Sequence, residues 1–213
     1  MTFDKFFYTF VRVFFRVVFT LYNRFSIKWI EPLRDAGEGP IILACNHCSN
    51  LDPLVVGVAF PRFLRYFAKE ELFRPFLLRS IIRTLGAVSV SRADEASAAG
   101  ALKGFLKLLE EGSNVLIFPE GSRSMDGTLQ PLEGGVGLIA AHSRAAVLPV
   151  FIKGTYEAMP PGAAFVKPSK ITVVFGKLLT FAPEDCKGKG ARDRITAELQ
   201  EALSSLESST KIV

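Results

Sequence analysis

Residues 41–53 read Ile-Ile-Leu-Ala-Cys-Asn-His-Cys-Ser-Asn-Leu-Asp-Pro, and the expected fold follows from this stretch. Its first five residues are apolar and predict a short strand buried in a sheet. Asp52 and Pro53 predict the start of a helix, with the aspartate at the N-cap and the proline at the first helical position. His47 is therefore expected in a strand-to-helix loop, where α/β proteins often place ligands and chemistry.

His47 and Asp52 together have the composition of a general base. A carboxylate beside a histidine fixes its tautomer and stabilises the imidazolium that forms when the ring takes a proton. The alternative is structural, with Asp52 only capping the helix and His47 only hydrogen-bonded in the loop. The second histidine, His142, falls in an expected helix without a close acidic neighbour, and we interpret it as structural.

Short apolar runs alternate with helical segments along the rest of the chain. Strands are expected at residues 25–31, 41–45, 64–68, 87–91, 115–119, 147–153 and 171–176. Helices are expected at residues 52–60, 74–84, 93–111, 135–143 and 192–206. This alternation predicts an α/β fold with a largely parallel or mixed central sheet flanked by helices. We expect a single domain at residues 25–213, preceded by an amphipathic helix at residues 1–24.

The amino-acid composition indicates which classes of partner the protein can bind. The 213 residues include 26 Lys and Arg against 21 Asp and Glu, and 49% of the chain is hydrophobic, which fits a protein resting on an anionic membrane. The basic residues are dispersed among apolar ones, so nucleic acid is not an expected partner. Three cysteines (Cys45, Cys48 and Cys186) predict reduced thiols, and Cys45-x-x-Cys48 lacks the second ligand pair of a structural zinc site.

The N-terminal segment 3–22 is aromatic and apolar except for one narrow stripe. The stripe consists of Lys5, Thr9, Arg12, Arg16, Thr20 and Asn23, spaced three or four residues apart. This pattern predicts a helix lying along a membrane surface, apolar side down, with its cations reaching for lipid phosphates. Two central arginines argue against a membrane span. Packing on the protein's own core and an uncleaved anchor are the alternatives.

A second surface of this kind is a candidate at residues 60–84, where phenylalanines are mixed with arginines. The alternative is a pair of ordinary amphipathic helices covering the sheet. We expect the protein to associate with the cytoplasmic face of the inner or plasma membrane.

A turn rich in anion-binding groups follows the apolar run at residues 115–119. It contains Glu120, Gly121, Ser122 and Arg123. Arginine offers a planar fork that matches phosphate, serine and the glycine amide add donors, and Glu120 can hold an arginine or a substrate hydroxyl. A plain surface turn is the alternative. Another arginine, Arg92, follows the run at residues 85–91, so base and cations together predict a site for a phosphorylated alcohol.

Four ordered runs resemble the motifs of the 1-acylglycerol-3-phosphate acyltransferase family. They are residues 46–52 (Asn-His-Cys-Ser-Asn-Leu-Asp), 86–92, 118–124 (Phe-Pro-Glu-Gly-Ser-Arg-Ser) and 147–150 (Val-Leu-Pro-Val). The resemblance implies transfer of an acyl chain from acyl-CoA or acyl carrier protein to the free hydroxyl of lysophosphatidic acid, giving phosphatidic acid. It implies a thioester co-substrate, a membrane-lipid partner, and neither cofactor nor metal.

The resemblance also implies roles for individual residues. His47 would deprotonate the acceptor hydroxyl, and Asp52 would orient and stabilise the ring. The phosphate would be bound by Arg92, Glu120, Gly121, Ser122 and Arg123. We also expect Ser49 to contact substrate, and Pro149 would lie near the acyl-donor or acyl-chain channel.

One departure from the family pattern leaves the acceptor open. Relatives commonly carry a lysine before a glycine after the third motif, where this chain has Glu133-Gly134. Another lysolipid, such as a lysophospholipid or an acylated amino-acid lipid, is therefore an alternative acceptor. A hydrolase using Ser49 or Ser122 would need a Gly-x-Ser-x-Gly elbow, which the sequence lacks. A noncatalytic lipid-binding protein is a further alternative, which the presence of both His47 and Asp52 argues against.

Overall fold

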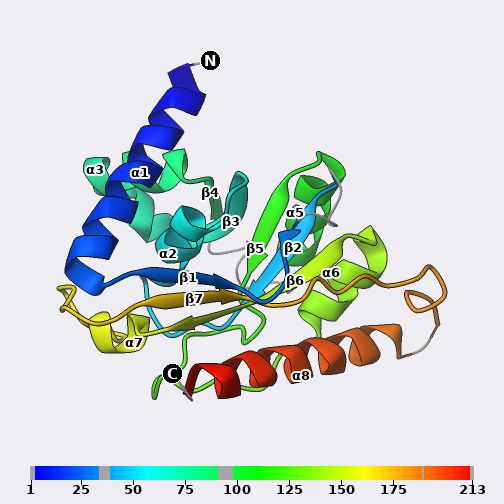
Figure 1. Cartoon of the computed structure of the whole chain (residues 1–213). Coiled ribbons are helices and arrows are strands. Elements are labelled where there is room, and N and C mark those ends of the chain that lie inside the picture. The colour runs from blue at the N-terminus through cyan, green and yellow to red at the C-terminus, as the bar shows by residue number, and fades with distance from the viewer. Residues whose placement is uncertain (1–2, 34–38, 91–97, 189, 212–213) are drawn as a thin grey trace.

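The computed structural model describes residues 3–33, 39–90, 98–188 and 190–211 (Figure 1). Within these residues, seven strands form one sheet in the order β1-β7-β6-β2-β5-β3-β4. The strands are β1 (Ser26–Trp29), β2 (Ile41–Cys45), β3 (Leu64–Lys69), β4 (Ala87–Val90), β5 (Asn114–Ile117), β6 (Ala146–Lys153) and β7 (Thr172–Phe175). Neighbouring strands are parallel except β6 and β7, which are antiparallel. The expected α/β fold with a mixed sheet is confirmed.

Helices cover both faces of the sheet. They are α1 (Phe3–Asn23), α2 (Asp52–Ala59), α3 (Phe76–Thr84), α5 (Ala98–Glu110), α6 (Gly135–Ser143), α7 (Thr155–Ala158) and α8 (Ala191–Lys211), with a 3-10 turn η2 (Glu70–Phe73). The elements η2 and α7 were not expected, because a single turn is too short to show a helical period. Helix α8 extends to Lys211, beyond the expected end at residue 206. Residues 93–97 of the helix expected at residues 93–111 lie outside the described residues.

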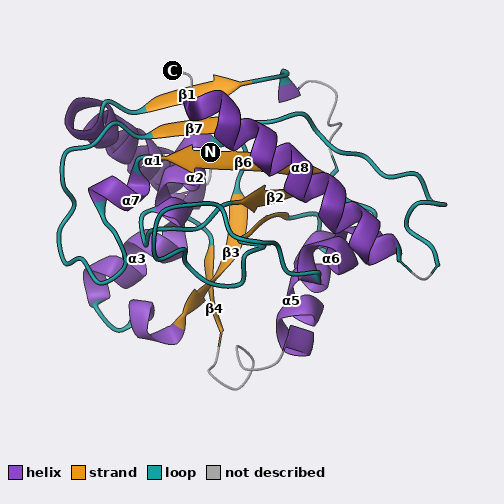
Figure 2. Cartoon of the chain, turned by 90° about the horizontal axis from the view of Figure 1, so that it is seen from below, coloured by secondary structure: helices purple, strands orange, loops and turns teal. Residues whose placement is uncertain are grey.

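The central strand β2 divides the core into two layers. All five of its residues are buried, as expected for an apolar strand covered on both faces. Ile41, Leu43 and Cys45 pack in the layer that includes residues of α1, α2 and α7, whereas Ile42 and Ala44 pack in the layer of α5, α6 and α8. Figure 2 shows α8 crossing the second face. Each fully buried Ile or Leu side chain contributes roughly 1.5–3 kcal/mol.

Strand register brings the two predicted motif loops together. β2 pairs in parallel with β5, with Ile42 beside Val115 and Ala44 beside Ile117. Both strands therefore end at the same edge of the sheet, where open α/β sheets form a crevice. The loop carrying His47 and the turn carrying Glu120 leave from adjacent positions on that edge.

Helix α1 is amphipathic as predicted, and its polar stripe contacts the protein only in part: Asn23 is buried and Arg12 half-buried, whereas Thr9, Arg16 and Thr20 are exposed. Val11 and Phe19 are buried, and Asn23 donates to the carbonyl of Lys167. The outward face is apolar: Phe10 is 58% exposed and Leu21 81%. In Figure 1, α1 stands along one side of the molecule beside α2 and α3. Among the described residues, no helix combines the length and apolarity needed to cross a membrane.

Within this stripe, Arg12 turns toward the end of α2 and does not extend freely outward. The Arg12 guanidinium donates from Nε to the carbonyl of Val58 at 3.2 Å and from Nη1 to that of Pro61 at 3.3 Å. These two carbonyls lie at the end of α2 and just beyond it. Carbonyl groups at the end of a helix lack an intrahelical N–H partner, so these two accept hydrogen bonds from Arg12 of the neighbouring helix α1.

Candidate active site

The centre of the site is the pair His47 and Asp52. His47 Nδ1 lies 2.8 Å from Asp52 Oδ2, and the carboxylate is fully buried, whereas the imidazole side chain is 18% exposed. An ionised Asp52 fixes the tautomer with the proton on Nδ1. No described residue hydrogen-bonds Nε2, which leaves that nitrogen free to exchange a proton with a substrate.

Asp52 is held by the loop that precedes it, and the expectation that it caps α2 is wrong. The helix begins at Asp52, the cap position is Leu51, and no side chain caps it. Asp52 Oδ2 instead accepts the backbone N–H groups of Cys48 and Ser49, each at 2.8 Å. The carboxylate turns back because the loop amides and the imidazole offer three donors. Oδ1 is buried without a hydrogen-bond partner among the described residues.

The ring of His47 is positioned from the neighbouring strand end. It stacks on Phe118, with ring centroids 3.9 Å apart and planes 19° from parallel. The backbone carbonyl of His47 accepts the N–H of Ser124 at 2.7 Å. These contacts from Phe118 and Ser124 were missed by sequence reasoning, although both residues lie within the third motif.

Glu120 joins the two motif loops. Its Oε1 accepts the backbone N–H of His47, and its Oε2 accepts the N–H of Gln130 at 2.9 Å. Burial raises the pKa of Glu120, and the two backbone hydrogen bonds offset part of the rise. Glu120 is 6% exposed, and no described arginine forms an ion pair with it. Its role toward an arginine or a substrate hydroxyl stays a prediction.

Arg123 reaches the loop of the first motif. Its Nη1 donates to Asn50 Oδ1 at 2.9 Å, and the described residues offer it no carboxylate partner. Its charge therefore remains available to an anion at this edge. Ser122 and Gly121 are exposed beside it.

Gly121 adopts a left-handed conformation, with φ of 71°. A Cβ built on it would lie 2.4 Å from Glu133 Oε1, so the carboxylate of Glu133 lies directly against the turn. Glu133 is itself tied to the third motif, because its backbone N–H donates to the carbonyl of Pro119 at 2.7 Å. An exposed acidic side chain thus lies beside the turn expected to bind phosphate.

Ser49 does not have the exposure expected of a substrate-binding residue. It is fully buried, and its hydroxyl donates to the carbonyl of Met159 at 2.7 Å and accepts the N–H of Leu51 at 3.1 Å. Both hydrogen bonds are made within the protein, one of them to a segment 110 residues away, so Ser49 positions the loop. The same burial argues against Ser49 as the nucleophile of a hydrolase.

The structure gives no direct evidence of a substrate role for Pro149 or Arg92. Pro149 is buried in β6 beside Ala44 of β2, so a role in an acyl channel stays a prediction. Arg92 lies outside the described residues, and its phosphate-binding role also stays a prediction.

The second histidine, His142, is exposed near the end of α6, with Nδ1 2.9 Å from the carbonyl oxygen of Leu138.

Asn46 is a positioning residue that sequence reasoning missed. Its buried side-chain amide donates to the carbonyl of Ile152 at 3.0 Å and accepts that residue's N–H at 2.7 Å. The pair locks the end of β2 to β6 one residue before His47. The only available signal was a polar residue directly after an apolar strand.

The two cysteines near His47, Cys45 and Cys48, are free and buried. Burial, reinforced by the Asp52 carboxylate, raises the pKa of Cys48 to about 12. Burial also raises the pKa of Cys45. Because the thiolate is the attacking form, neither residue is activated as a nucleophile at neutral pH. Within the described ranges, no cluster of three metal-binding side chains occurs.

Comparison with known proteins gives consistent matches. Residues 24–153 match the family model described as Acyltransferase. The chain is 30% identical over 167 residues to the 1-acyl-sn-glycerol-3-phosphate acyltransferase of Bacillus subtilis (strain 168), which covers 78% of each chain. It is 27% identical over 179 residues to the chloroplastic 1-acyl-sn-glycerol-3-phosphate acyltransferase LPAT1 of Arabidopsis thaliana, spanning 84% of this chain but only 50% of that protein.

A solved structure has the same fold. The crystal structure of the 1-acyl-sn-glycerophosphate acyltransferase PlsC from Thermotoga maritima superposes with a TM-score of 0.75 at 24% sequence identity. The match covers 96% of this chain and 81% of that one.

Proposed function

The chain belongs to the Acyltransferase family, and we propose that it transfers a fatty acyl group from a thioester donor to the free hydroxyl of lysophosphatidic acid, forming phosphatidic acid. The relatives from Bacillus subtilis and Arabidopsis thaliana are named for this activity. The observation that carries the proposal is the 2.8 Å contact between His47 Nδ1 and the buried Asp52, which leaves Nε2 open. Acyl-CoA and acyl carrier protein are the two candidate donors.

The proposed chemistry is a single acyl transfer without an acyl-enzyme. His47 Nε2 takes the proton of the acceptor hydroxyl as its oxygen attacks the thioester carbonyl, and Asp52 stabilises the imidazolium. The tetrahedral intermediate collapses, the C–S bond breaks, and the leaving sulfur takes the proton back from Nε2. Glu120 and Phe118 keep the ring in place through this cycle.

We assign the acceptor's phosphate to the turn at residues 121–123, because Arg123 is the cation within the third motif and has no carboxylate partner within the described chain. Gly121 and Ser122 add exposed polar groups beside it. Arg92 remains a second candidate cation from the sequence pattern.

A different lysolipid is a second candidate acceptor, and Glu133 is the observation that favours it. Its carboxylate lies against Gly121 and would repel a second negative charge on a phosphate monoester. A zwitterionic headgroup, with a cation beyond its phosphate, would pair with Glu133 and Arg123 at once.

We further propose that α1 and α3 rest on the membrane that supplies the lysolipid. Both helices present large apolar side chains to solvent, including Phe10, Leu21, Phe76 and Leu77. α1 and α3 are in contact and lie side by side at one edge of the molecule (Figure 1). The net charge of +5 suits an anionic leaflet such as the cytoplasmic one.

The test is an acyl-transfer assay with purified protein in detergent. A panel of lysolipids is incubated with acyl-CoA or acyl carrier protein, and the products are identified by mass. His47→Ala should reduce kcat by about a hundredfold to ten-thousandfold, since general-base catalysis contributes that much. His142→Ala is the matched control and should retain activity. Full activity of His47→Ala would contradict the mechanism, and no acylated product with any lysolipid would contradict the function.

A further inference from the structure

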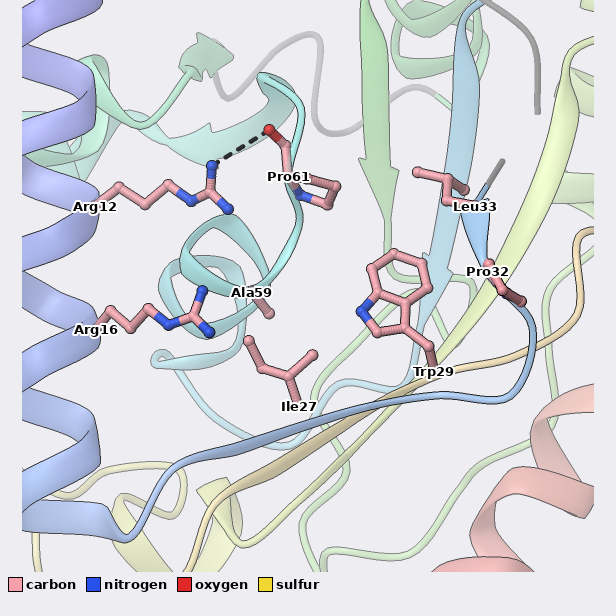
Figure 3. A pocket seen from close by; sticks show the side chains of 8 residues that line it. All are labelled: Arg12, Arg16, Ile27, Trp29, Pro32, Leu33, Ala59 and Pro61. Carbon is pink, nitrogen blue, oxygen red and sulfur yellow. Dashed lines mark hydrogen bonds between the residues drawn. The ribbon is translucent and has the colours of Figure 1, made fainter. Parts of the chain in front are cut away.

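A cavity of about 690 Å³ lies between α1, β1 and the turn after α2. Its lining includes Arg12, Arg16, Ile27, Trp29, Leu33 and Pro61. In Figure 3, the two arginines extend from α1 into the cavity, and Trp29 lies across from them. The volume falls in the range of small-ligand sites, about 300–1,000 Å³.

The arginine side of the cavity is short of acceptors. Arg12 is fixed by the carbonyls of Val58 and Pro61, which satisfy two of its five N–H groups without neutralising its charge. The Arg16 guanidinium has neither a hydrogen bond nor an ion pair among the described residues. Glu31, which follows Trp29 by two residues, pairs instead with Lys177 at 3.6 Å. Two guanidinium groups thus face one partly enclosed space without a described counter-charge.

The opposite wall is apolar and rigid. Trp29 stacks on Phe175, with ring centroids 4.0 Å apart and planes 16° from parallel. Its indole N–H has no hydrogen-bond partner among the described residues, and Figure 3 shows this nitrogen on the ring edge that faces α1. Ile27 and Leu33 extend the apolar surface on either side. The cavity therefore combines free donors at one side with an apolar floor.

We propose that this cavity binds one anionic amphiphile, with its phosphate between Arg12 and Arg16 and its apolar part against Trp29 and Leu33. Guanidinium groups favour phosphate because planar N–H pairs match its oxygens. The outward face of α1 is apolar, so a lipid of the adjoining leaflet is the source that the location favours.

This site is separate from the acyl-transfer site. Asp52 begins α2 and Ala59 ends it, and the cavity is lined at the Ala59 end. Eight helical residues span about 12 Å, so the cavity lies about one helix length from the Asp52 carboxylate. The inference therefore goes beyond the proposed reaction and does not depend on it.

The chain contains a single tryptophan, so its fluorescence reports on this cavity alone. Full-length protein in a neutral detergent is titrated with monododecyl phosphate while Trp29 emission is recorded. Dodecanol and inorganic phosphate, each alone, are the comparison ligands. We expect a saturable change with monododecyl phosphate only. An equal change with dodecanol would overturn the role of charge, and equally tight binding of inorganic phosphate would overturn the amphiphile.

Variants then locate the binding site. Arg16→Gln should weaken binding about tenfold or more, because it removes charge-assisted hydrogen bonds, and it leaves the Arg12 contacts to the fold intact. Lys28→Gln is the matched control: it removes the same charge from β1, but strand alternation places Lys28 on the face opposite Ile27 and Trp29. Unchanged affinity in Arg16→Gln, or an equal loss in Lys28→Gln, would overturn the proposal. A loss in Arg123→Ala in place of Arg16→Gln would show that the probe occupies the catalytic edge, which also overturns it.

Discussion

Glu120 accepts a hydrogen bond from the backbone N–H of His47, a residue 73 positions earlier in the chain. The first and third motifs are therefore joined directly by a carboxylate. Its other oxygen accepts the backbone N–H of Gln130, so both oxygens are engaged by the backbone. This explains why an acidic residue sits in a turn otherwise suited to anions: it holds the general-base loop in place.

Asp52→Asn should abolish most activity while the protein stays folded. The amide keeps the volume of the carboxylate but is uncharged. It therefore cannot stabilise the imidazolium, and its hydrogen bonds to the three N–H donors are weaker. We expect kcat to fall about a hundredfold or more. Steady-state kinetics with a melting curve on the same sample would measure both effects. A kcat near that of the wild type would show that Asp52 is only structural.

Glu120→Gln should alter the pH dependence of stability. Burial raises the pKa of Glu120 in the folded protein, so the folded state holds this proton more tightly than the unfolded chain. Its contribution to stability is fully present below the unfolded pKa and is lost as the pH rises through the folded pKa. The free energy of unfolding of the wild type minus that of Glu120→Gln should therefore decrease from about pH 4 to about pH 7.

Urea unfolding at both pH values measures this difference. Asp126→Asn provides a control of opposite sign, because hydrogen bonds from Thr128 and Ser124 lower the pKa of Asp126 to about 2. The Asp126 contribution is present above its unfolded pKa and is lost only as the pH falls through about 2, so it should change little over the same interval. A flat difference for Glu120→Gln would contradict the raised pKa.

Arg123→Ala should weaken acceptor binding more than the chemical step. Loss of a charged hydrogen-bond donor to phosphate should raise KM for lysophosphatidic acid about tenfold or more, with kcat nearly unchanged. Lys103→Ala removes the same charge from an exposed position on α5 and serves as the control. Equal KM values in Arg123→Ala and wild type would exclude Arg123 from the phosphate site.

Glu133→Lys should shift the acceptor preference toward the more anionic lysolipid. The ratio of kcat/KM for lysophosphatidic acid to that for lysophosphatidylethanolamine should rise about tenfold, because a cation replaces a carboxylate beside Gly121. Competition assays with both acceptors in one mixture give this ratio directly. Glu111→Lys, on an exposed position, controls for the change in net charge. An unchanged ratio would mean that Glu133 does not face the headgroup.

Phe10→Asp combined with Val17→Asp should weaken membrane binding without disturbing the fold. Both side chains are more than half exposed on the outward face of α1, so the charges affect only transfer into the lipid interface. In flotation with phosphatidylglycerol vesicles, the double variant should bind with an affinity about tenfold or more below that of the wild type. Ser204→Asp with Ser205→Asp adds the same charge to exposed positions of α8. Equal loss in both double variants would point to net charge in place of α1.

Much of the fold could be predicted from the sequence because it depends on local residue patterns. The apolar run at residues 41–45 predicted β2, and alternation of strands with helices predicted the layered sheet. His47 and Asp52 are close in sequence, so a short loop was enough to predict their contact. Single-turn elements such as α7 were missed because four residues carry no period.

The sequence by itself determined the strands, the main helices, the spacing of His47 and Asp52, and the amphipathic nature of α1. Only the tertiary structure decided that Arg12 of α1 contacts the end of α2, that Ser49 is buried, and that Glu120 binds the backbone of His47. The physical reason is the sequence distance over which each kind of interaction acts. Periodicity and turn chemistry act between neighbours, whereas the partner of a buried polar group is chosen by whichever distant segment packs against it.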